Sequence, residues 1–183
     1  RAVQCVHVSR DMGGRMTDCG AVAGGLGAKE NNKNPGGYEC TWNPRDVELA
    51  GQGTAEYVQD NKLKFVHYQR RCSALWDVEV PGHGKFEAYA NRDSLLYRKQ
   101  YSLDDIPTIL RGTIRRPGYA AAWNALVQIR LTNADFPILD SANITYHELM
   151  EAFAPSGSGS VKDRIAGMLD VPPNGDVMNR LVW

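Results

Sequence analysis

Five arginines lie within one short part of the chain, and they are the residues best suited to bind a charged ligand. They are Arg92, Arg98, Arg111, Arg115 and Arg116, in a chain of 183 residues whose formal net charge is zero. A guanidinium group is planar and always charged, and it can hold a carboxylate or a phosphate through two parallel hydrogen bonds. The clustering therefore indicates an anion site, a nucleic-acid contact or a charged surface.

The segment TILRGTIR, residues 108–115, is predicted to be a strand. Side chains alternate along a strand, so Arg111, Thr113 and Arg115 share one face. That face gathers two guanidinium groups and a hydroxyl within about 14 Å. Gly112, on the opposite face, lets another backbone or a ligand approach closely. Such a face suits a ligand that carries several carboxylates.

Arg92 precedes a predicted short helix, SLLYRKQY, with Asp93 or Ser94 as its N-terminal cap. The start of a helix offers backbone N–H donors to an anion. A competing interpretation needs no ligand. In it, Arg111 and Arg115 pair with Glu or Asp on a neighbouring strand, and Asp93 only caps its helix. The spacing of the residues leaves both interpretations open.

Composition excludes several classes of protein. The 21 basic and 21 acidic residues balance, with a pI near 7.1, which argues against a nucleic-acid or anionic-membrane binder. No apolar run approaches the roughly 20 residues that cross a bilayer. The four cysteines (Cys5, Cys19, Cys40 and Cys72) form no CxxC pair, and the histidines are scattered. We therefore expect free thiols in the cytoplasm, and neither a disulfide framework nor a metal site.

Three glycine pairs, beginning at Gly25, Gly51 and Gly82, superficially resemble a dinucleotide-binding fingerprint. Each pair has glutamate near the position where the fingerprint has its third glycine or alanine, and a carboxylate there would repel a pyrophosphate. We interpret all three as turns. The chain alone therefore shows no cofactor-binding domain.

The pattern of the whole chain predicts an α+β fold, with a mixed, largely antiparallel sheet, flanking helices and a helical segment after it. Alternating apolar residues predict two hairpins, and Pro117 begins a helix. Thr145 and Glu148 form a capping-box pattern before another helix. We place a boundary near Thr132, between an α/β domain of residues 1–131 and a helical domain of residues 132–183. Strands are predicted at 16–28 (running into a glycine-rich turn), 38–42, 55–59, 63–68, 74–80 and 85–90. A helical turn is predicted at 43–50, and further helices at 161–169 and from 176 onward.

Longer motifs resemble a known family. The segment 89–129, YANRDSLLYRKQYSLDDIPTILRGTIRRPGYAAAWNALVQI, resembles the core of the glutamate-forming saccharopine dehydrogenases, which carry NRDS, a short helix and RGTLRYxGF. The stretch 23–47, AGGLGAKENNKNPGGYECTWNPRDV, is similar to the family's GGLPAPExxxNPxGYKFSWSPR. The tail from residue 144 onward resembles the family's helical insertion. The match covers nearly the whole chain in order.

This resemblance implies an oxidoreductase of lysine metabolism. The family interconverts saccharopine with glutamate and 2-aminoadipate semialdehyde, and hydride passes to or from NADP or NAD. It also implies a homodimer built from a Rossmann domain, a substrate-binding and dimerisation domain, and a helical insertion. This chain resembles the second part and most of the third, so we expect it to be a piece of a longer enzyme, inactive without the Rossmann domain.

Residue by residue, the resemblance assigns substrate binding to Arg92, Thr113, Ile114 and Arg115. The two arginines would hold carboxylates of saccharopine, which carries three, while Thr113 and Ile114 would add hydroxyl and backbone donors. We assign no catalytic residue, because in this chemistry the cofactor supplies the hydride and the protein orients the substrate and stabilises charge.

Three departures from the family pattern widen the expected substrate to a saccharopine-like amino acid with several carboxylates. Arg116 stands where the family has an aromatic residue, and Ala23 stands where it often has cysteine. A family aspartate near the substrate would lie before Arg1. Two alternatives accompany the main interpretation. One is a dehydrogenase for another carboxyalkylated amine, such as a polyamine precursor, and the other is a non-enzymatic dimerisation or ligand-binding module.

Overall fold

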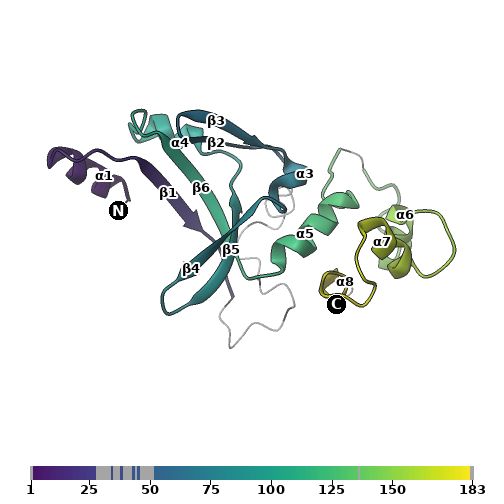
Figure 1. The fold of residues 1–183 in the computed structure, drawn as a ribbon. Coiled ribbons are helices and arrows are strands. Elements are labelled where there is room, and N and C mark those ends of the chain that lie inside the picture. The colour runs from purple at the N-terminus through teal and green to yellow at the C-terminus, as the bar shows by residue number, and fades with distance from the viewer. Residues whose placement is uncertain are drawn as a thin grey trace.

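The computed structural model describes residues 2–27, 34, 38, 43, 45, 52–135 and 137–181. A sheet with flanking helices forms one part of the molecule, and α5 leads from it to a helical segment (Figure 1). The strands are β1 (Asp18–Ala23), β2 (Ala55–Gln59), β3 (Lys62–Val66), β4 (Leu75–Val80), β5 (Gly84–Ala90) and β6 (Thr108–Arg115). The helices are α1 (Ala2–Asp11), α3 (Tyr68–Arg71), α4 (Leu95–Gln100), α5 (Tyr119–Gln128), α6 (Tyr146–Phe153), α7 (Val161–Leu169) and α8 (Asp176–Leu181).

Strand β6 is the centre of the sheet. The antiparallel order is β3-β2-β6-β5-β4, and β1 pairs with β6 in parallel. β2 meets β6 at Ile109, whereas β5 pairs with the stretch from Gly112 to Arg115. Two hairpins therefore share one long strand, one hairpin near each of its ends. This arrangement confirms the predicted mixed, largely antiparallel sheet.

The two hairpin turns have the backbone geometry that their residues favour. Asp60 and Asn61 join β2 to β3 with φ of 53° and 59°. Asp and Asn enter this left-handed region more readily than most residues. Gly82 and Gly84 join β4 to β5 with φ of 77° and 94°. Both hairpins follow the sequence prediction, and the glycine pair at Gly82 lies in a turn as expected.

Helix α1 was not predicted from the sequence, yet it covers one end of the sheet. Its Val6 is 1% exposed and packs against Leu103, Ile106 and Ile109. The predicted strand at 38–42 and the helical turn at 43–50 fall mostly outside the described residues.

Helix α5 connects the sheet to a second hydrophobic core. Two residues after the helix, Arg130 has a left-handed φ of 65°, and the Leu131 N–H donates to the Leu126 carbonyl at 3.0 Å. The second core has as its buried members Ile129, Ile165, Ala166 and Met178. This core includes residues from both sides of position 131.

The helical segment begins with the predicted cap. The Thr145 side chain accepts from the Glu148 N–H, and the Glu148 carboxylate accepts from the Thr145 N–H at 2.7 Å. At the other end of the segment, α8 returns to the start of α5. A Cβ added at Gly118 would lie 2.8 Å from a guanidinium nitrogen of Arg180. The last helix thus contacts the residue before α5.

Gly112 has close neighbours, but they are side chains, whereas the sequence predicted another backbone or a ligand. A Cβ at this position would lie 2.8 Å from Val22 Cγ1 and 2.9 Å from Trp76 Cζ2. Val22 is on β1, beside Gly112 in the sheet, and Trp76 is on β4, so side chains of two strands fill the space over the middle of β6. The tight approach leaves the opposite face of β6 for the arginines.

We predict that Gly112→Ala destabilises the protein by about 1–3 kcal/mol, because the added methyl group overpacks a filled site. Urea unfolding of the two proteins measures the difference. Gly20→Ala on β1 is the matched control, since nothing lies within 4 Å of a Cβ there. Equal stability of the Gly112→Ala and Gly20→Ala variants would contradict this packing.

Candidate functional site

The face of β6 that carries Arg111, Thr113 and Arg115 lies under helices. Strand register places Glu87 opposite Arg115 and Tyr89 opposite Thr113. Backbone N–H groups at the start of α5 bond to the Glu87 carboxylate on this face. The predicted alternation therefore describes the arrangement correctly, and the site is a polar layer between the sheet and its helices.

Arg115 is the central group of this layer. It is 9% exposed, and one guanidinium N–H donates to the carbonyl of Ile114 at 3.0 Å. Its guanidinium carbon lies 4.6 Å from the ring centre of Tyr38 and 5.0 Å from that of Tyr119. Rings that face a guanidinium stabilise its charge without neutralising it. Its Nε is buried and has no hydrogen-bond partner among the described residues.

Glu87 faces Arg115 across the strand pair but bonds elsewhere. Its carboxylate accepts from the N–H of Gly118 at 3.1 Å and from the N–H of Ala120 at 2.5 Å. These donors begin α5, where backbone N–H groups lack partners within the helix and favour a negative charge. No ion pair to Arg115 exists among the described residues.

Arg111 points to a different helix from Arg115. It donates to the Asp93 carbonyl at 2.9 Å, and its guanidinium carbon lies 3.9 Å from the ring centre of Tyr97. The Asp93 carboxylate caps α4, because its Oδ1 accepts from the N–H of Leu95 and of Leu96. Among the described residues, neither Arg111 nor Arg115 forms the ion pair to a neighbouring strand that the alternative interpretation predicted. The same interpretation also predicted that Asp93 caps its helix, and this cap is present.

Arg92 is exposed at the entry to α4, and its backbone is fixed on both sides. Its N–H donates to Asn91 Oδ1 at 2.7 Å, and its carbonyl accepts from the Glu56 N–H at 2.9 Å. Its charge is close enough to Arg71 to lower the pKa of that buried group slightly, although burial is the main cause of the shift. Arg92 therefore lies near Arg71, which itself lies over the ring of Tyr89.

The remaining two predicted site residues flank Arg115 in sequence. Thr113 is half-buried and lies opposite Ala23 of β1 as well as Tyr89. Ile114 presents its carbonyl to Arg115. Gly24, just beyond β1, lies so close that a Cβ there would overlap the Ile114 carbonyl oxygen and lie 3.0 Å from Arg115 Nη1. Backbone from two parallel strands thus surrounds one side of the guanidinium.

Arg116, the departure from the family pattern, is held away from Arg115. It is half-buried and donates to the Gly27 carbonyl at 2.8 Å. Arg98 lies on a helix and would be expected to be an exposed charge. It is instead half-buried and donates to the Asp104 carbonyl at 2.6 Å. Neither Arg98 nor Arg116 contributes to the polar layer around Arg115.

Sequence reasoning missed four residues of this layer: Arg71, Cys72, Glu87 and Tyr89. Arg71 is 4% exposed and lies over the ring of Tyr89, at 5.7 Å from its centre. Its pKa is lowered by burial, and the pKa of Tyr89 is raised mainly by burial. The alternation of KFEAYA could have placed Glu87 and Tyr89 on one face, but no local signal indicates a buried Arg71.

Two of the three glycine pairs lack the geometry of a dinucleotide-binding turn. Gly82 and Gly84 form a hairpin turn, and Gly53 with φ of 83° precedes a strand. Neither glycine segment joins a strand to the start of a helix, which is the geometry that receives a pyrophosphate. Among the described residues, no three His, Cys, Asp or Glu are placed to hold a metal ion. Within the same part of the chain, no helix combines the length and apolar character that crossing a membrane requires.

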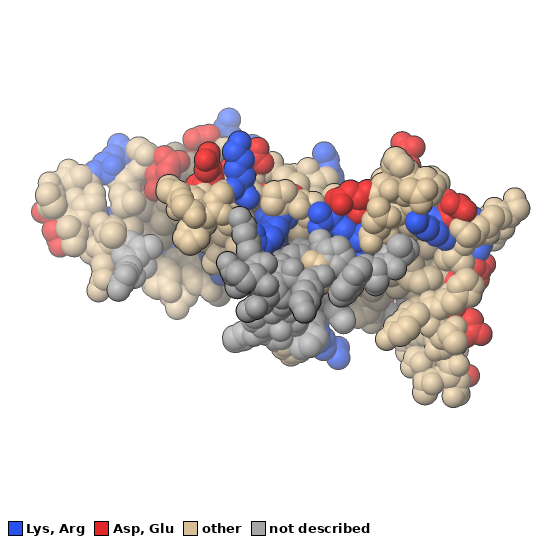
Figure 2. Space-filling model, turned by 90° about the horizontal axis from the view of Figure 1, so that it is seen from below, with Lys and Arg blue, Asp and Glu red and all other residues tan. Residues whose placement is uncertain are grey.

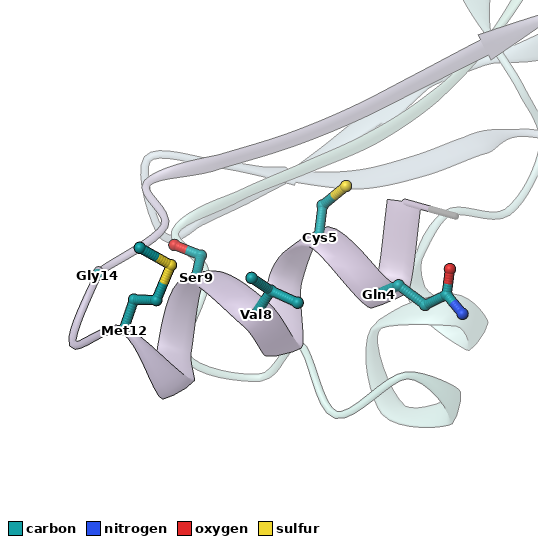
Figure 3. Close-up of a pocket in the computed structure, with 6 residues that line it drawn as sticks. All are labelled: Gln4, Cys5, Val8, Ser9, Met12 and Gly14. Atoms are coloured by element: carbon teal, nitrogen blue, oxygen red, sulfur yellow. The ribbon is translucent and has the colours of Figure 1, made fainter.

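Two further surfaces differ in character from the arginine layer. Figure 2 shows basic and acidic side chains interspersed over one face of the molecule, with several basic groups close together near its middle. A shallow pocket along α1 is lined by Gln4, Cys5, Val8, Ser9, Met12 and Gly14 (Figure 3). The described lining of that pocket has no Lys or Arg, so it offers a carboxylate no charged partner.

The fold is an α+β domain whose buried Arg115 has no ion-pair partner among the described residues. Residues 1–173 match the family model described as "Saccharopine dehydrogenase C-terminal domain", and the chain belongs to this family. The match confirms the resemblance that the NRDS and RGTIRR motifs indicated.

Relatives and a solved structure agree with the family match. The chain is 30% identical over 168 residues to "Saccharopine dehydrogenase [NADP(+), L-glutamate-forming]" of Saccharomyces cerevisiae, covering 91% of the chain and 37% of that protein. It is 33% identical over 156 residues to "Alpha-aminoadipic semialdehyde synthase, mitochondrial" of Bos taurus, covering 81% of the chain and 16% of that protein. The apo saccharopine dehydrogenase (L-Glu forming) structure from Saccharomyces cerevisiae matches with a TM-score of 0.80 at 26% identity, over 100% of the chain and 42% of that structure. The chain thus spans a minor part of each of these proteins.

We predict that the free energy of unfolding falls as the pH rises above about 9. Burial raises the pKa of Cys72 to about 11, so the folded state keeps a proton that the unfolded state releases. By pH 11, the raised pKa of Cys72 should lower the free energy of unfolding by on the order of 2 kcal/mol. Urea titrations across this range measure it. Cys72→Ser should flatten the profile in part, because Tyr89 and Tyr119 also have raised pKa values.

Cys5→Ser is the matched control, because it removes an exposed thiol. This variant should leave the pH dependence of the free energy of unfolding unchanged. Identical pH profiles for Cys72→Ser and the wild type would contradict the burial of an ionisable thiol at this position.

Proposed function

We propose that this chain is the substrate-binding part of a saccharopine dehydrogenase-type oxidoreductase. The full-length enzyme would interconvert saccharopine with glutamate and 2-aminoadipate semialdehyde, using NADP or NAD. One observation carries the proposal. The nine-tenths-buried guanidinium of Arg115 lies between aromatic rings with no carboxylate partner among the described residues.

A carboxylate of the substrate is the group that Arg115 lacks. A buried cation without a counter-ion is costly, and a ligand that brings one recovers that energy on binding. Bidentate pairing would also fix the ligand's orientation. We infer that Arg115 binds one carboxylate while Thr113 and Ile114 contribute a hydroxyl and backbone groups beside it. Arg92, exposed at the entry to α4, would bind a second carboxylate at the outer end of the substrate.

The cofactor and the assembly are parts of the same proposal. We infer that NADP or NAD is bound by a Rossmann domain outside this chain and supplies or accepts the hydride. We also infer a homodimer. Leu63 and Phe65, 50% and 59% exposed on the edge strand β3, support an interface. Light scattering of the full-length protein should give twice the monomer mass.

The compartment and the domain division also remain proposals. The described thiols of Cys5, Cys19 and Cys72 are free, which supports a reducing compartment such as the cytoplasm. We keep residues 1–131 as the substrate-binding and dimerisation domain and 132–183 as a helical domain. The left-handed residue just after α5 supports a division there, although the second core uses residues from both sides. Limited proteolysis that cleaves first near residue 132 would support the division.

We predict that the 183-residue chain binds saccharopine weakly and does not oxidise it in the presence of NADP or NAD. Isothermal titration calorimetry measures binding, and absorbance of the reduced cofactor measures turnover. Glycine, with a single carboxylate, is the control ligand and should give no signal at the same concentration. Turnover by this chain alone would overturn its assignment as a part without the cofactor domain.

We predict that Arg115→Ala in the full-length enzyme costs about 2–4 kcal/mol of transition-state stabilisation, as for the loss of a buried charge-assisted contact. The ratio of kcat/KM for saccharopine between wild type and variant measures it. Arg70→Ala, at an exposed arginine, controls for the loss of positive charge. A loss below about 0.5 kcal/mol would assign Arg115 a purely structural role.

A further inference from the structure

Arg71 has an unusual environment for a charged side chain. It ends the short helix α3 and is only 4% exposed. One guanidinium nitrogen donates to two backbone carbonyls, those of Gln52 and Gly53, each at 3.3 Å. No carboxylate pairs with it among the described residues. Lys and Arg are almost never buried without such partners, so its contacts with the Gln52–Gly53 turn are its main stabilisation.

The turn that Arg71 holds lies beside a cavity. The cavity, of about 230 Å³, separates the turn from the end of α5, with Arg130 and Thr132 in its lining. The Gln52 side-chain amide donates across this cavity to the Thr132 carbonyl. Because side chains do not fill the space beside it, the position of the turn depends on these hydrogen bonds.

The same turn supports Arg92. Gly53 has φ of 83°, and a Cβ at this position would lie 3.3 Å from Arg92 Cδ and 3.8 Å from its Cγ. The aliphatic stem of Arg92 therefore rests on the glycine. Arg71 and Arg92 carry like charges near each other. Repulsion between them disfavours an orientation in which the Arg92 guanidinium points inward, toward Arg71.

We propose that Arg71 is a positioning residue that sets the orientation of Arg92 through the Gln52–Gly53 turn. The inference rests on the proposed function, since it takes Arg92 as a contact for a substrate carboxylate. Arg71 does not touch the substrate. It suits the role because a planar guanidinium can bond to two adjacent carbonyls while lying over the ring of Tyr89.

The test uses the full-length enzyme with saccharopine as the probe. Arg71→Met keeps the stem over Tyr89 and removes the donors. We expect it to raise KM for saccharopine about tenfold and to leave KM for the cofactor unchanged, as for a misplaced binding group. Arg71→Lys should recover part of the loss, because it keeps the charge and a donor. Arg70→Met, at the exposed neighbour on the same helix, is the matched control.

A double-mutant cycle separates positioning from direct contact. If Arg71 acts through Arg92, Arg71→Met should have no further effect on KM once Arg92→Ala is present. An equal rise in KM in both backgrounds would overturn the inference, as would a lowered Tm with wild-type KM. A wild-type KM for Arg92→Ala would remove the proposed role of Arg92, and this inference with it.

Gly53→Ala tests the same idea with Arg71 intact and guards against an Arg71→Met variant that does not fold. Its methyl group would press on the Arg92 stem at a left-handed backbone position, so KM should rise as it does for Arg71→Met. Wild-type KM values in both Gly53→Ala and Arg71→Lys would overturn the inference.

Discussion

The bonds from the start of α5 to the Glu87 carboxylate are the interaction on which the arginine layer depends. Two backbone N–H groups, those of Gly118 and Ala120, satisfy the carboxylate and fix the helix on the sheet. The same bonds remove the acid that strand register places opposite Arg115. One side chain thus anchors a helix and leaves a buried cation without its nearest counter-ion. The aromatic rings of Tyr38 and Tyr119 make that arrangement tolerable, because they contact the guanidinium without neutralising it.

The layer is built from segments that are distant in sequence. Arg115 comes from the central strand, Arg71 from a short helix after the β2–β3 hairpin, and Tyr89 from the strand beside β6. Tyr89 lies between the two arginines, and their charges lower its pKa against the larger effect of burial. Cys72 adds a neutral thiol to the same layer. Among the described residues, this layer holds two arginines, Arg71 and Arg115, and one carboxylate, Glu87. An excess of buried positive charge stores electrostatic free energy that an anionic ligand can release.

Local signals in the sequence were sufficient for much of the fold. The Thr145 capping box, the hairpin residues Asp60 and Asn61 and the alternation of TILRGTIR each act within a few residues, so they predict structure directly. The positions of segments that depend on contacts distant in sequence could not be predicted in the same way. Helix α1 has β-branched residues in a short pattern compatible with either a helix or a strand, and only its contacts with the sheet select the helix. Arg71 resembles a surface residue in HYQRRCS, because its burial depends on a turn some 20 residues earlier.

The contact between Gly118 and Arg180 has a consequence for how this domain can change over evolution. Position 118 has φ of 88°, and the space beside it is filled by the guanidinium of the last helix. A side chain at position 118 and a long one at position 180 exclude each other. Substitutions at these two positions should therefore be correlated among descendants of this sequence, although one begins the helix over the sheet and the other lies near the end of the chain.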